Sequence, residues 1–140
     1  KVRFIKNLKF LKKFQGGNYV FLIDQKIFNL YNNYFNKVKE DIIILHAKES
    51  TKTLNQAVKI YRLLLQNSAK RNLTLVVVGG GVLQDLGGFV ASTLYRGINW
   101  IYIPTTLLAQ ADSCIGSKTS LNFSKYKNIL GTFYPPVKFI

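Results

Sequence analysis

Apolar positions along the chain group into four short runs, separated by segments in which apolar residues recur every three or four positions. The runs cover residues 19–23, 42–45, 73–78 and 100–103, and each predicts a β-strand. The run at 42–45 shows no polar alternation, which indicates a strand buried on both faces. After residue 112 the pattern weakens, and a loop with short strand pieces around 119–123 is expected.

The segments between the runs predict helices. Helical spacing is seen over 27–35, and helices are expected over 82–95 and 105–111. Thr53 with Gln56 three positions later has the pattern of a capping box at a helix start. Strands that alternate with helices form a parallel sheet with helices on both faces, so the fold class is α/β in one domain.

The N-terminal segment differs from this pattern. Its apolar residues are separated by even steps, which predicts a β-strand or hairpin that precedes the α/β fold. They are Val2, Phe4, Leu8, Phe10 and Phe14.

Composition indicates a folded chain that is part of a longer protein. It has 140 residues, 48% of them hydrophobic, and only three prolines, which argues against disorder. It contains no methionine and stops within the apolar run 137–140, so we expect a fragment. No apolar run reaches the roughly 18 residues of a membrane span, and the basic N-terminus lacks the core of a secretion signal. The single cysteine, Cys114, excludes an internal disulfide and fits a reducing compartment, the cytoplasm.

The net charge is +14, from 20 basic and six acidic residues. Such an excess favours anionic ligands such as phosphates, nucleotides, nucleic acid or acidic lipid. The basic residues are spread along the chain, which equally fits a lysine-rich composition with the acidic part of the protein elsewhere. One histidine and one cysteine cannot build a zinc site by themselves.

A glycine triplet carries the clearest chemical signal. Gly79, Gly80 and Gly81 follow the third apolar run and open a helix, but Gln84 stands at the third position of the G-x-G-x-x-G fingerprint. Small residues let the backbone approach a pyrophosphate, and the free N–H groups at the helix start carry partial positive charge. Three glycines cost about 0.5–1 kcal/mol each relative to alanine, so a nucleotide site is favoured over a plain tight turn. Asp85 is expected in the first turn of this helix.

Further polar clusters follow the ends of the predicted strands. Because ligands bind at the carboxyl ends of parallel strands, residues 46–52 and 104–106 are expected to share an edge with the glycine triplet and Asp24. Thr105 and Thr106 can contact a ligand or cap a helix, and Glu49 with Lys52 can be a surface ion pair.

Asp112 ends the apolar stretch 107–111, where burial would disfavour its charge unless a cation answered it. Lys118 and Lys127 are candidates for that cation or for phosphate binding, although each can also be a solvated lysine. Arg96 is, by itself, a surface arginine beside a helix C-cap.

Five segments together resemble one family. They are GGGVLQDLGGF, YRG, PTTLLAQADS, IGSKTSLN and KNILGTFYPP. In order and approximate spacing they resemble the N-terminal, nucleotide-binding domain of 3-dehydroquinate synthase and its sugar-phosphate cyclase relatives, most strongly over 73–136. The resemblance implies a Rossmann-like sheet, NAD as cofactor, and zinc or another divalent metal in the complete enzyme. The family holds that metal in a helical C-terminal domain that this chain lacks, so no metal ligand is assigned.

The resemblance also assigns roles to single residues. It implies a wall of catalytic residues between cofactor and substrate. It also implies that Arg96 is the catalytic arginine that family dimers contribute to the neighbouring subunit's phosphate pocket. The wall comprises Asp112, Lys118, Lys127 and Asn128. It implies a cofactor site with Asp24, Glu49 and Lys52 at the adenosine half and the two threonines beside the nicotinamide half. The complete cofactor list is Asp24, Glu49, Lys52, Gly79, Gly80, Gly81, Val82, Leu83, Gln84, Asp85, Thr105, Thr106, Lys118 and Lys127.

By this resemblance the function is that of a 3-dehydroquinate synthase-like carbon–oxygen lyase of the shikimate pathway. Such an enzyme uses NAD to cyclise a seven-carbon keto-acid phosphate with phosphate elimination, and works as a homodimer. Gln84, Ser117 and the run 120–122 depart from the family's glycine-rich pattern. They leave open a related cyclase with a different substrate. A basic nucleic-acid-binding module is the remaining alternative, but the chain lacks a clustered basic stripe with interleaved aromatics. We expect no membrane association, and we expect the fragment alone to be inactive.

Overall fold

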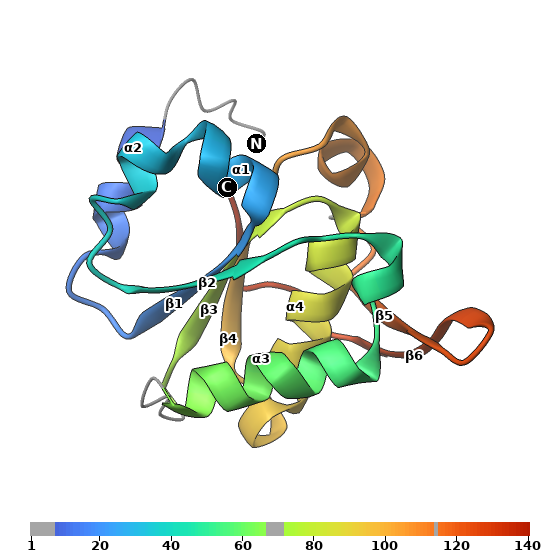
Figure 1. Cartoon of the computed structure of the whole chain (residues 1–140). Helices are drawn as coiled ribbons and strands as arrows, with labels where there is room; N and C mark the ends of the chain where they lie inside the picture. Colours follow the sequence, from blue (N-terminus) through green and yellow to red (C-terminus); the bar gives the residue numbers. More distant parts are fainter. Residues whose placement is uncertain (1–7, 67–71, 114) are drawn as a thin grey trace.

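A parallel sheet forms the centre of the computed structural model, which describes residues 8–66, 72–113 and 115–140 (Figure 1). Its strand order is β2-β1-β3-β4-β7, and all pairs are parallel. The strands are β1 (Tyr19–Asp24), β2 (Asp41–Leu45), β3 (Thr74–Gly79), β4 (Asn99–Pro104) and β7 (Lys138–Phe139). All four apolar runs are therefore strands as expected, and the apolar end of the chain adds a short fifth one.

The helices lie on both faces of this sheet. The α-helices are α1 (Gln25–Leu30), α2 (Asn32–Phe35), α3 (Leu54–Gln66) and α4 (Gly81–Thr93). In addition, η1 (Leu8–Phe14), η2 (Glu49–Thr51) and η3 (Leu94–Arg96) are 3₁₀-helices, and η4 (Ala109–Ser113) is a π-helix. Helices α3 and α4 cover one face (Figure 1), while η1, α1 and α2 pack on the other. The expected α/β class, a Rossmann-like sheet with helices on both faces, is confirmed.

The central strands are apolar throughout because each of their faces meets a separate core. In β3, Leu75 and Val77 pack towards α3 and α4, whereas Val76 and Val78 pack towards η1 and α1. Alternate side chains of a strand point to opposite faces, so a strand covered on both sides needs an uninterrupted apolar run. The helix start at Thr53 is also confirmed, because the Gln56 N–H donates to Thr53 Oγ1 at 3.3 Å.

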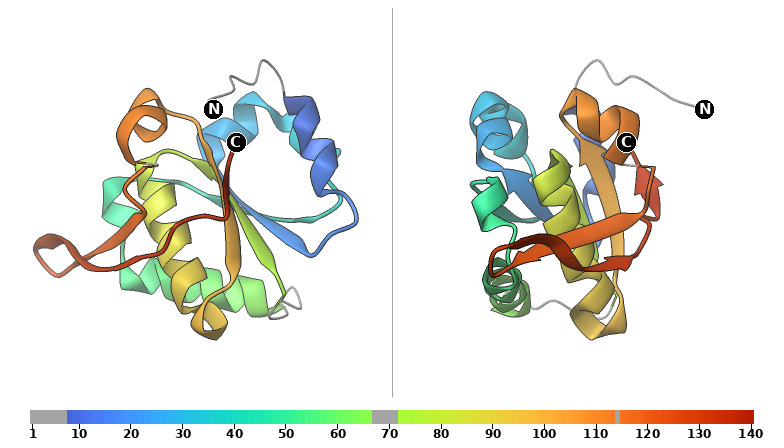
Figure 2. Two further views of the ribbon diagram at one scale, coloured as in Figure 1. Left: turned by 180° about the vertical axis from the view of Figure 1, so that it is seen from behind. Right: turned by 90° about the vertical axis from the view of Figure 1, so that its right-hand side faces the viewer.

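After η4 the chain forms an antiparallel hairpin of β5 (Lys118–Phe123) and β6 (Tyr126–Phe133). The hairpin crosses α4 on the outside of the sheet (Figure 2, right) and buries Thr119 and Leu121. At Gly131 a Cβ would come within 2.0 Å of the Thr119 carbonyl oxygen, so this position requires glycine. The strand piece expected around 119–123 is confirmed, but its long partner β6 has no clear apolar alternation in the sequence.

The N-terminal expectation was wrong where it can be compared. Residues 8–14 form the 3₁₀-helix η1 and no strand. Leu8, Leu11 and Phe14 are three residues apart, which places them on one side of a 3₁₀-helix, and Leu11 and Phe14 are buried. Leu11 does not fit the even spacing on which the expected strand rested. Val2 and Phe4 lie outside the described residues.

Two further expectations need correction. Strand β2 is an edge strand, so only Ile43 is buried and Ile44 is 45% exposed. The helical segment expected over 27–35 is interrupted at Tyr31, whose φ and ψ of −124° and 25° separate α1 from α2.

Cys114 lies outside the described residues. None of the helices in the described part of the chain has the length and apolar content of a membrane span.

Candidate functional site

A cavity of about 320 Å³ opens at the carboxyl edge of the sheet, beside the ends of β1, β3 and β4. Residues from four separate stretches of the chain form its wall. They are Asp24, Lys26, Ile27, Ala47, Gly80, Gly81, Val82, Leu83, Thr105 and Thr106. The parallel topology therefore brings together the strand-end clusters, as the sequence pattern predicted.

The glycine turn leaves donors free at this cavity. Helix α4 begins after Gly80, whose carbonyl accepts the N–H groups of Leu83 and Gln84 at 3.0 Å each. The N–H groups of Gly81 and Val82 precede the first intrahelical donors and so have no helical partner, which gives this end partial positive charge. The Gly79 carbonyl holds the turn to β4 by accepting the Tyr102 hydroxyl and the Thr105 N–H, both at 3.0 Å.

The three glycines serve different purposes. A Cβ on Gly79 would lie 2.8 Å from Leu83 Cδ2, and one on Gly80 would lie 3.0 Å from Thr106 Cγ2. At Gly81 the nearest atom is Ser113 Oγ, at 3.9 Å, so a side chain there would enter open space beside the cavity. Packing accounts for the first two glycines. Gly81 keeps the helix start accessible and gives the cavity a backbone cradle that fits an anionic ligand.

Asp24 and Thr106 also cap helices at the cavity rim. Asp24 Oδ1 accepts the Lys26 N–H at 2.7 Å at the start of α1. Thr106 Oγ1 accepts the Ala109 N–H at 3.2 Å. The capping alternative for this threonine is thus correct, and Thr105 and Thr106 line the cavity as well.

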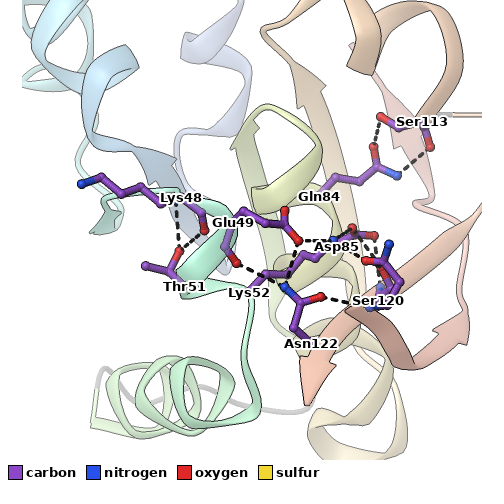
Figure 3. A network of polar contacts seen from close by, with 10 residues as sticks. Lys48, Glu49, Thr51, Lys52, Gln84, Asp85, Ser113, Ser120 and Asn122 are labelled. Atoms are coloured by element: carbon purple, nitrogen blue, oxygen red, sulfur yellow. Dashed lines mark hydrogen bonds and ion pairs between the residues drawn. The ribbon is translucent and has the colours of Figure 1, made fainter. Parts of the chain in front are cut away.

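Beside the cavity lies a polar network centred on Lys52 (Figure 3), which is only 5% exposed. Its Nζ donates to Asp85 Oδ2 at 3.1 Å and to Asn128 Oδ1, and it lies 3.4 Å from Glu49 Oε1. A lysine this deeply buried needs such partners, because an unpaired charge in the interior is costly. Lys52 with Glu49 is therefore more than the surface pair that the sequence alone allowed.

Asp85 connects α4 to the hairpin. Its Oδ1 accepts the Ser120 N–H at 3.0 Å, and the Ser120 hydroxyl lies 3.0 Å from both Asp85 Oδ2 and Asn128 Oδ1, with one hydrogen to donate. Burial raises the pKa of Asp85, and the bonds from Lys52 and Ser120 oppose that shift. Because α4 begins at Gly81, Asp85 is its fifth residue, and the expectation of a first-turn position was wrong.

Glu49 and the two asparagines extend the network towards the hairpin turn. The Asn122 amide donates to Glu49 Oε1 at 2.8 Å, and this bond is the largest cause of the lowered pKa of Glu49. Burial opposes the lowering, and the attraction of Lys52 adds a smaller contribution to it. Asn122 Oδ1 accepts the Asn128 N–H at 2.9 Å, which supports Asn128 at a φ of +57°. A second cavity of about 350 Å³ opens here, and Glu49 and Lys127 are among its lining residues.

A separate contact joins α4 to η4. The Gln84 amide donates to the Ser113 carbonyl at 2.6 Å and accepts the Ser113 hydroxyl at 2.8 Å (Figure 3). Gln84 and Asp85 therefore point towards protein groups, and neither lines the 320 Å³ cavity.

Other predicted site residues lie apart from that cavity. Lys118 is exposed at the start of β5, and Arg96 lies in η3, at the far end of α4 from the glycine turn. Asp112 is exposed on η4, so the expectation of a buried charge was wrong. The apolar stretch before it is itself largely exposed, since Leu107 and Leu108 are 82% and 71% accessible.

Sequence reasoning missed several residues of the site. Lys26 lines the cavity two residues after Asp24, so the strand-end rule could have included it, whereas Ala47 falls within the predicted edge 46–52. Ser120 and Asn122 alternate with the buried Thr119 and Leu121 along β5, and this two-residue period was the available signal. Nothing in the sequence pattern indicated Ser113.

The described residues do not form a metal centre, since they contain no cluster of three or more histidine, cysteine, aspartate or glutamate side chains. The groups that line the 320 Å³ cavity instead suit a dinucleotide. The cradle at Gly81, the free amides of the helix start and the threonine hydroxyls are donors suited to its phosphates and ribose.

The parallel sheet, the glycine turn and the cavity at the carboxyl edge together define a Rossmann-like α/β domain. Comparison with known proteins specifies it further. The model of the 3-dehydroquinate synthase N-terminal family matches residues 42–140, and the chain belongs to this family.

Named relatives agree with this family. The chain is 43% identical to the 3-dehydroquinate synthase of Clostridium tetani over 129 residues, which are 89% of this chain and 35% of that protein. It thus spans about a third of the length of the curated relatives it matches.

Two solved structures share the fold. A 2-deoxy-scyllo-inosose synthase complexed with carbaglucose-6-phosphate, NAD⁺ and Co²⁺ superposes with a TM-score of 0.78 at 28% identity, covering 94% of this chain and 39% of that one. A 2-epi-5-epi-valiolone synthase from Streptomyces hygroscopicus subsp. jinggangensis, with NAD⁺ and Zn²⁺ bound, gives 0.81 at 26% identity, covering 99% and 44%.

Proposed function

We propose that this chain is the NAD-binding part of a 3-dehydroquinate synthase. The observation that carries the proposal is the cavity at the carboxyl edge, where the accessible Gly81, the free amides of the helix start and two threonine hydroxyls converge. The family membership and the NAD⁺ named for two similar cyclase structures support it.

In this proposal the N–H groups of Gly81 and Val82 bind the pyrophosphate, and the field of α4 favours its charge. Asp24 accepts hydrogen bonds from a ribose hydroxyl, while Thr105 and Thr106 orient the nicotinamide half. NAD, when bound, supplies a reversible hydride acceptor. The metal of the complete enzyme is held outside the described residues, so no step is assigned to it.

The substrate side of the site is assigned to the lysines. Lys118, with Lys127 and Asn128, would hold the negative charge of a phosphorylated sugar acid, whose phosphate leaves by elimination. Asp112 would complete that wall. Arg96 would serve the neighbouring subunit of a homodimer, which fits its position at the far end of α4.

The substrate could also be a different sugar phosphate. The two similar cyclase structures carry the names of other cyclases, and one holds carbaglucose-6-phosphate. The departures at Gln84, Ser117 and residues 120–122 are compatible with this alternative. Phosphate-release assays of the full-length protein with the seven-carbon keto-acid phosphate and with glucose 6-phosphate distinguish the two substrates.

The cofactor proposal is tested with a pair of substitutions in one helix. Gly81→Ala adds a methyl group beside the cavity and touches no atom closer than 3.9 Å, whereas Gly87→Ala places one 2.6 Å from Val77 Cγ2, between α4 and β3. In the full-length protein, Gly81→Ala is expected to raise the Kd for NAD by about tenfold with an unchanged Tm. Gly87→Ala is expected to lower the Tm and leave the Kd nearly unchanged. Equal NAD binding by wild type and Gly81→Ala would refute the assignment of the cavity.

The catalytic proposal is tested at Lys118. Lys118→Ala in the full-length protein is expected to abolish phosphate release without changing the Tm, because the side chain is exposed at the start of β5. Unchanged turnover would remove Lys118 from the site. The 140-residue chain alone is expected to release no phosphate in the same assay.

We also expect the full-length protein in the cytoplasm, and fractionation of cells tests this location.

A further inference from the structure

Gln84 uses both ends of its amide on one distant residue. The side chain is 4% exposed, its Nε2 donates to the Ser113 carbonyl at 2.6 Å, and its Oε1 accepts the Ser113 hydroxyl at 2.8 Å. The two residues are 29 positions apart and belong to α4 and η4. A buried amide with donor and acceptor both satisfied by one partner forms a two-point connection, which we term the Gln84–Ser113 clamp.

The clamp holds the far end of a segment whose near end is fixed by the bond from the Thr105 N–H to the Gly79 carbonyl. This segment, residues 105–113, starts with the two threonines of the cavity wall and ends in η4. Leu107 and Leu108 are largely exposed, and Ala109, at 1% exposure, is its one residue in the core among those described. Because little apolar area fixes the segment, polar contacts must determine where it lies.

The clamp also sets the distance between the segment and the glycine turn. Ser113 Oγ is the atom nearest to a Cβ built on Gly81, at 3.9 Å, so the end of the segment packs against the helix start. At its other end, Thr106 Oγ1 accepts the Ala109 N–H, which joins the cavity wall to η4. A movement of η4 away from α4 would therefore displace Thr106 relative to the free amides of Gly81 and Val82.

We propose that Gln84 is a positioning residue, which fixes residues 105–113 against α4 and thereby aligns the threonine hydroxyls with the amides of the glycine turn. Gln84 does not line the cavity and acts through Ser113. The inference rests on the proposed NAD site. It implies that the half of the dinucleotide beside Thr105 and Thr106 depends on the clamp, whereas the phosphates at the glycine turn do not.

The test compares two ligands on the full-length protein. Gln84→Met keeps the approximate size of the side chain and removes both hydrogen bonds. Without the clamp, residues 105–113 occupy the binding-competent position only part of the time, and the apparent Kd rises by the inverse of that fraction. We expect the Kd for NAD to rise by about tenfold and the Kd for ADP to change by less than about twofold. Gln66→Met, at the exposed end of α3, is the matched control and should change neither Kd.

Ser113→Ala provides a milder second variant. It removes the hydroxyl bond and keeps the bond from Gln84 to the Ser113 carbonyl, so the Kd for NAD should rise by about threefold. This variant decides the question if Gln84→Met fails to fold.

If Gln84→Met weakens the binding of NAD and of ADP equally, or changes neither, the positioning role is wrong. The cofactor site is still upheld in that case, provided that the wild-type protein binds NAD. Failure of the wild-type protein to bind NAD would instead refute the proposed function.

Discussion

Replacement of Lys52 by methionine is the perturbation whose result the structure specifies most fully. The substitution keeps the apolar stem and removes the ammonium group that contacts Asp85, Asn128 and Glu49. The carboxylate of Asp85, with a side chain 21% exposed, then loses its cation and keeps only the bonds from Ser120. Breaking a buried ion pair costs about 3–5 kcal/mol, and the partial exposure of Asp85 favours the lower end, about 3 kcal/mol at pH 8.

The cost should depend on pH with a defined sign. Burial already raises the pKa of Asp85 in the folded protein, and removal of Lys52 takes away an attraction that opposes this rise. A folded-state pKa above the unfolded value means that the folded state binds the proton more tightly. Proton binding by Asp85 therefore stabilises the fold fully below the pKa of the unfolded state, about 4, and this stabilisation is lost as the pH rises through the pKa of the folded state. Lys52→Met should therefore be less destabilising at about pH 4.5 than at about pH 8.

Urea unfolding followed by fluorescence of Trp100, the single tryptophan, measures this difference. Trp100 is 2% exposed and packs in the core against α4, so its emission reports loss of that packing. Lys59→Met, an exposed lysine of α3, is the matched control and should change the free energy of unfolding by less than about 0.5 kcal/mol. A loss below about 1 kcal/mol, or the same loss at both pH values, would show that Lys52 is not a buried partner of an ionised Asp85.

Two further predictions concern the hairpin. Gly131→Ala should separate β5 from β6, because its Cβ would lie 2.0 Å from a backbone oxygen. Amide hydrogen exchange should then accelerate over residues 118–133 but not in β3. Gly116→Ala is the control and should have no such effect, because the atom nearest to its Cβ lies at 3.8 Å. Protected amides in Gly131→Ala would contradict the close approach. Asn122→Ala should raise the pKa of Glu49 towards its usual value, because the lost hydrogen bond is the largest cause of its lowering. Since a lowered carboxyl pKa stabilises the fold above the unfolded pKa and this effect is lost as pH falls, the variant's deficit should shrink in acid; an NMR titration of Glu49 that shows no shift would refute the assignment.

The central fold was predictable because it rests on local rules. The apolar runs identified four strands, and the glycine triplet identified the start of α4, since strands covered on two faces and a backbone cradle restrict which residues can occur. The errors arose where long-range position mattered. Residues 42–45 look like a central strand, yet β2 lies at the edge, and no local pattern reports the strand order. Residues 8–14 fit two periods, and packing selected the 3₁₀-helix through Leu11.

The candidate site divides in the same way. The strand-end rule correctly placed Asp24, the glycine turn and the two threonines around one cavity. It could not show that Lys52 is buried, since this depends on Asp85 and Asn128, which are 33 and 76 residues away along the chain. Nor could it find Ser113 or Ser120, whose contacts form only when η4 and the hairpin pack on α4.

The sequence by itself therefore determined the type and order of the central elements and the edge at which their polar ends meet. These properties follow from hydrophobic periodicity and backbone freedom, which act over a few residues. Only the tertiary structure decided which charges are buried, which polar groups form pairs and which segments close the cavity. Burial and pairing depend on neighbours that folding brings together. A lysine side chain can therefore be a solvated charge at one position in the chain and the centre of a polar network at another.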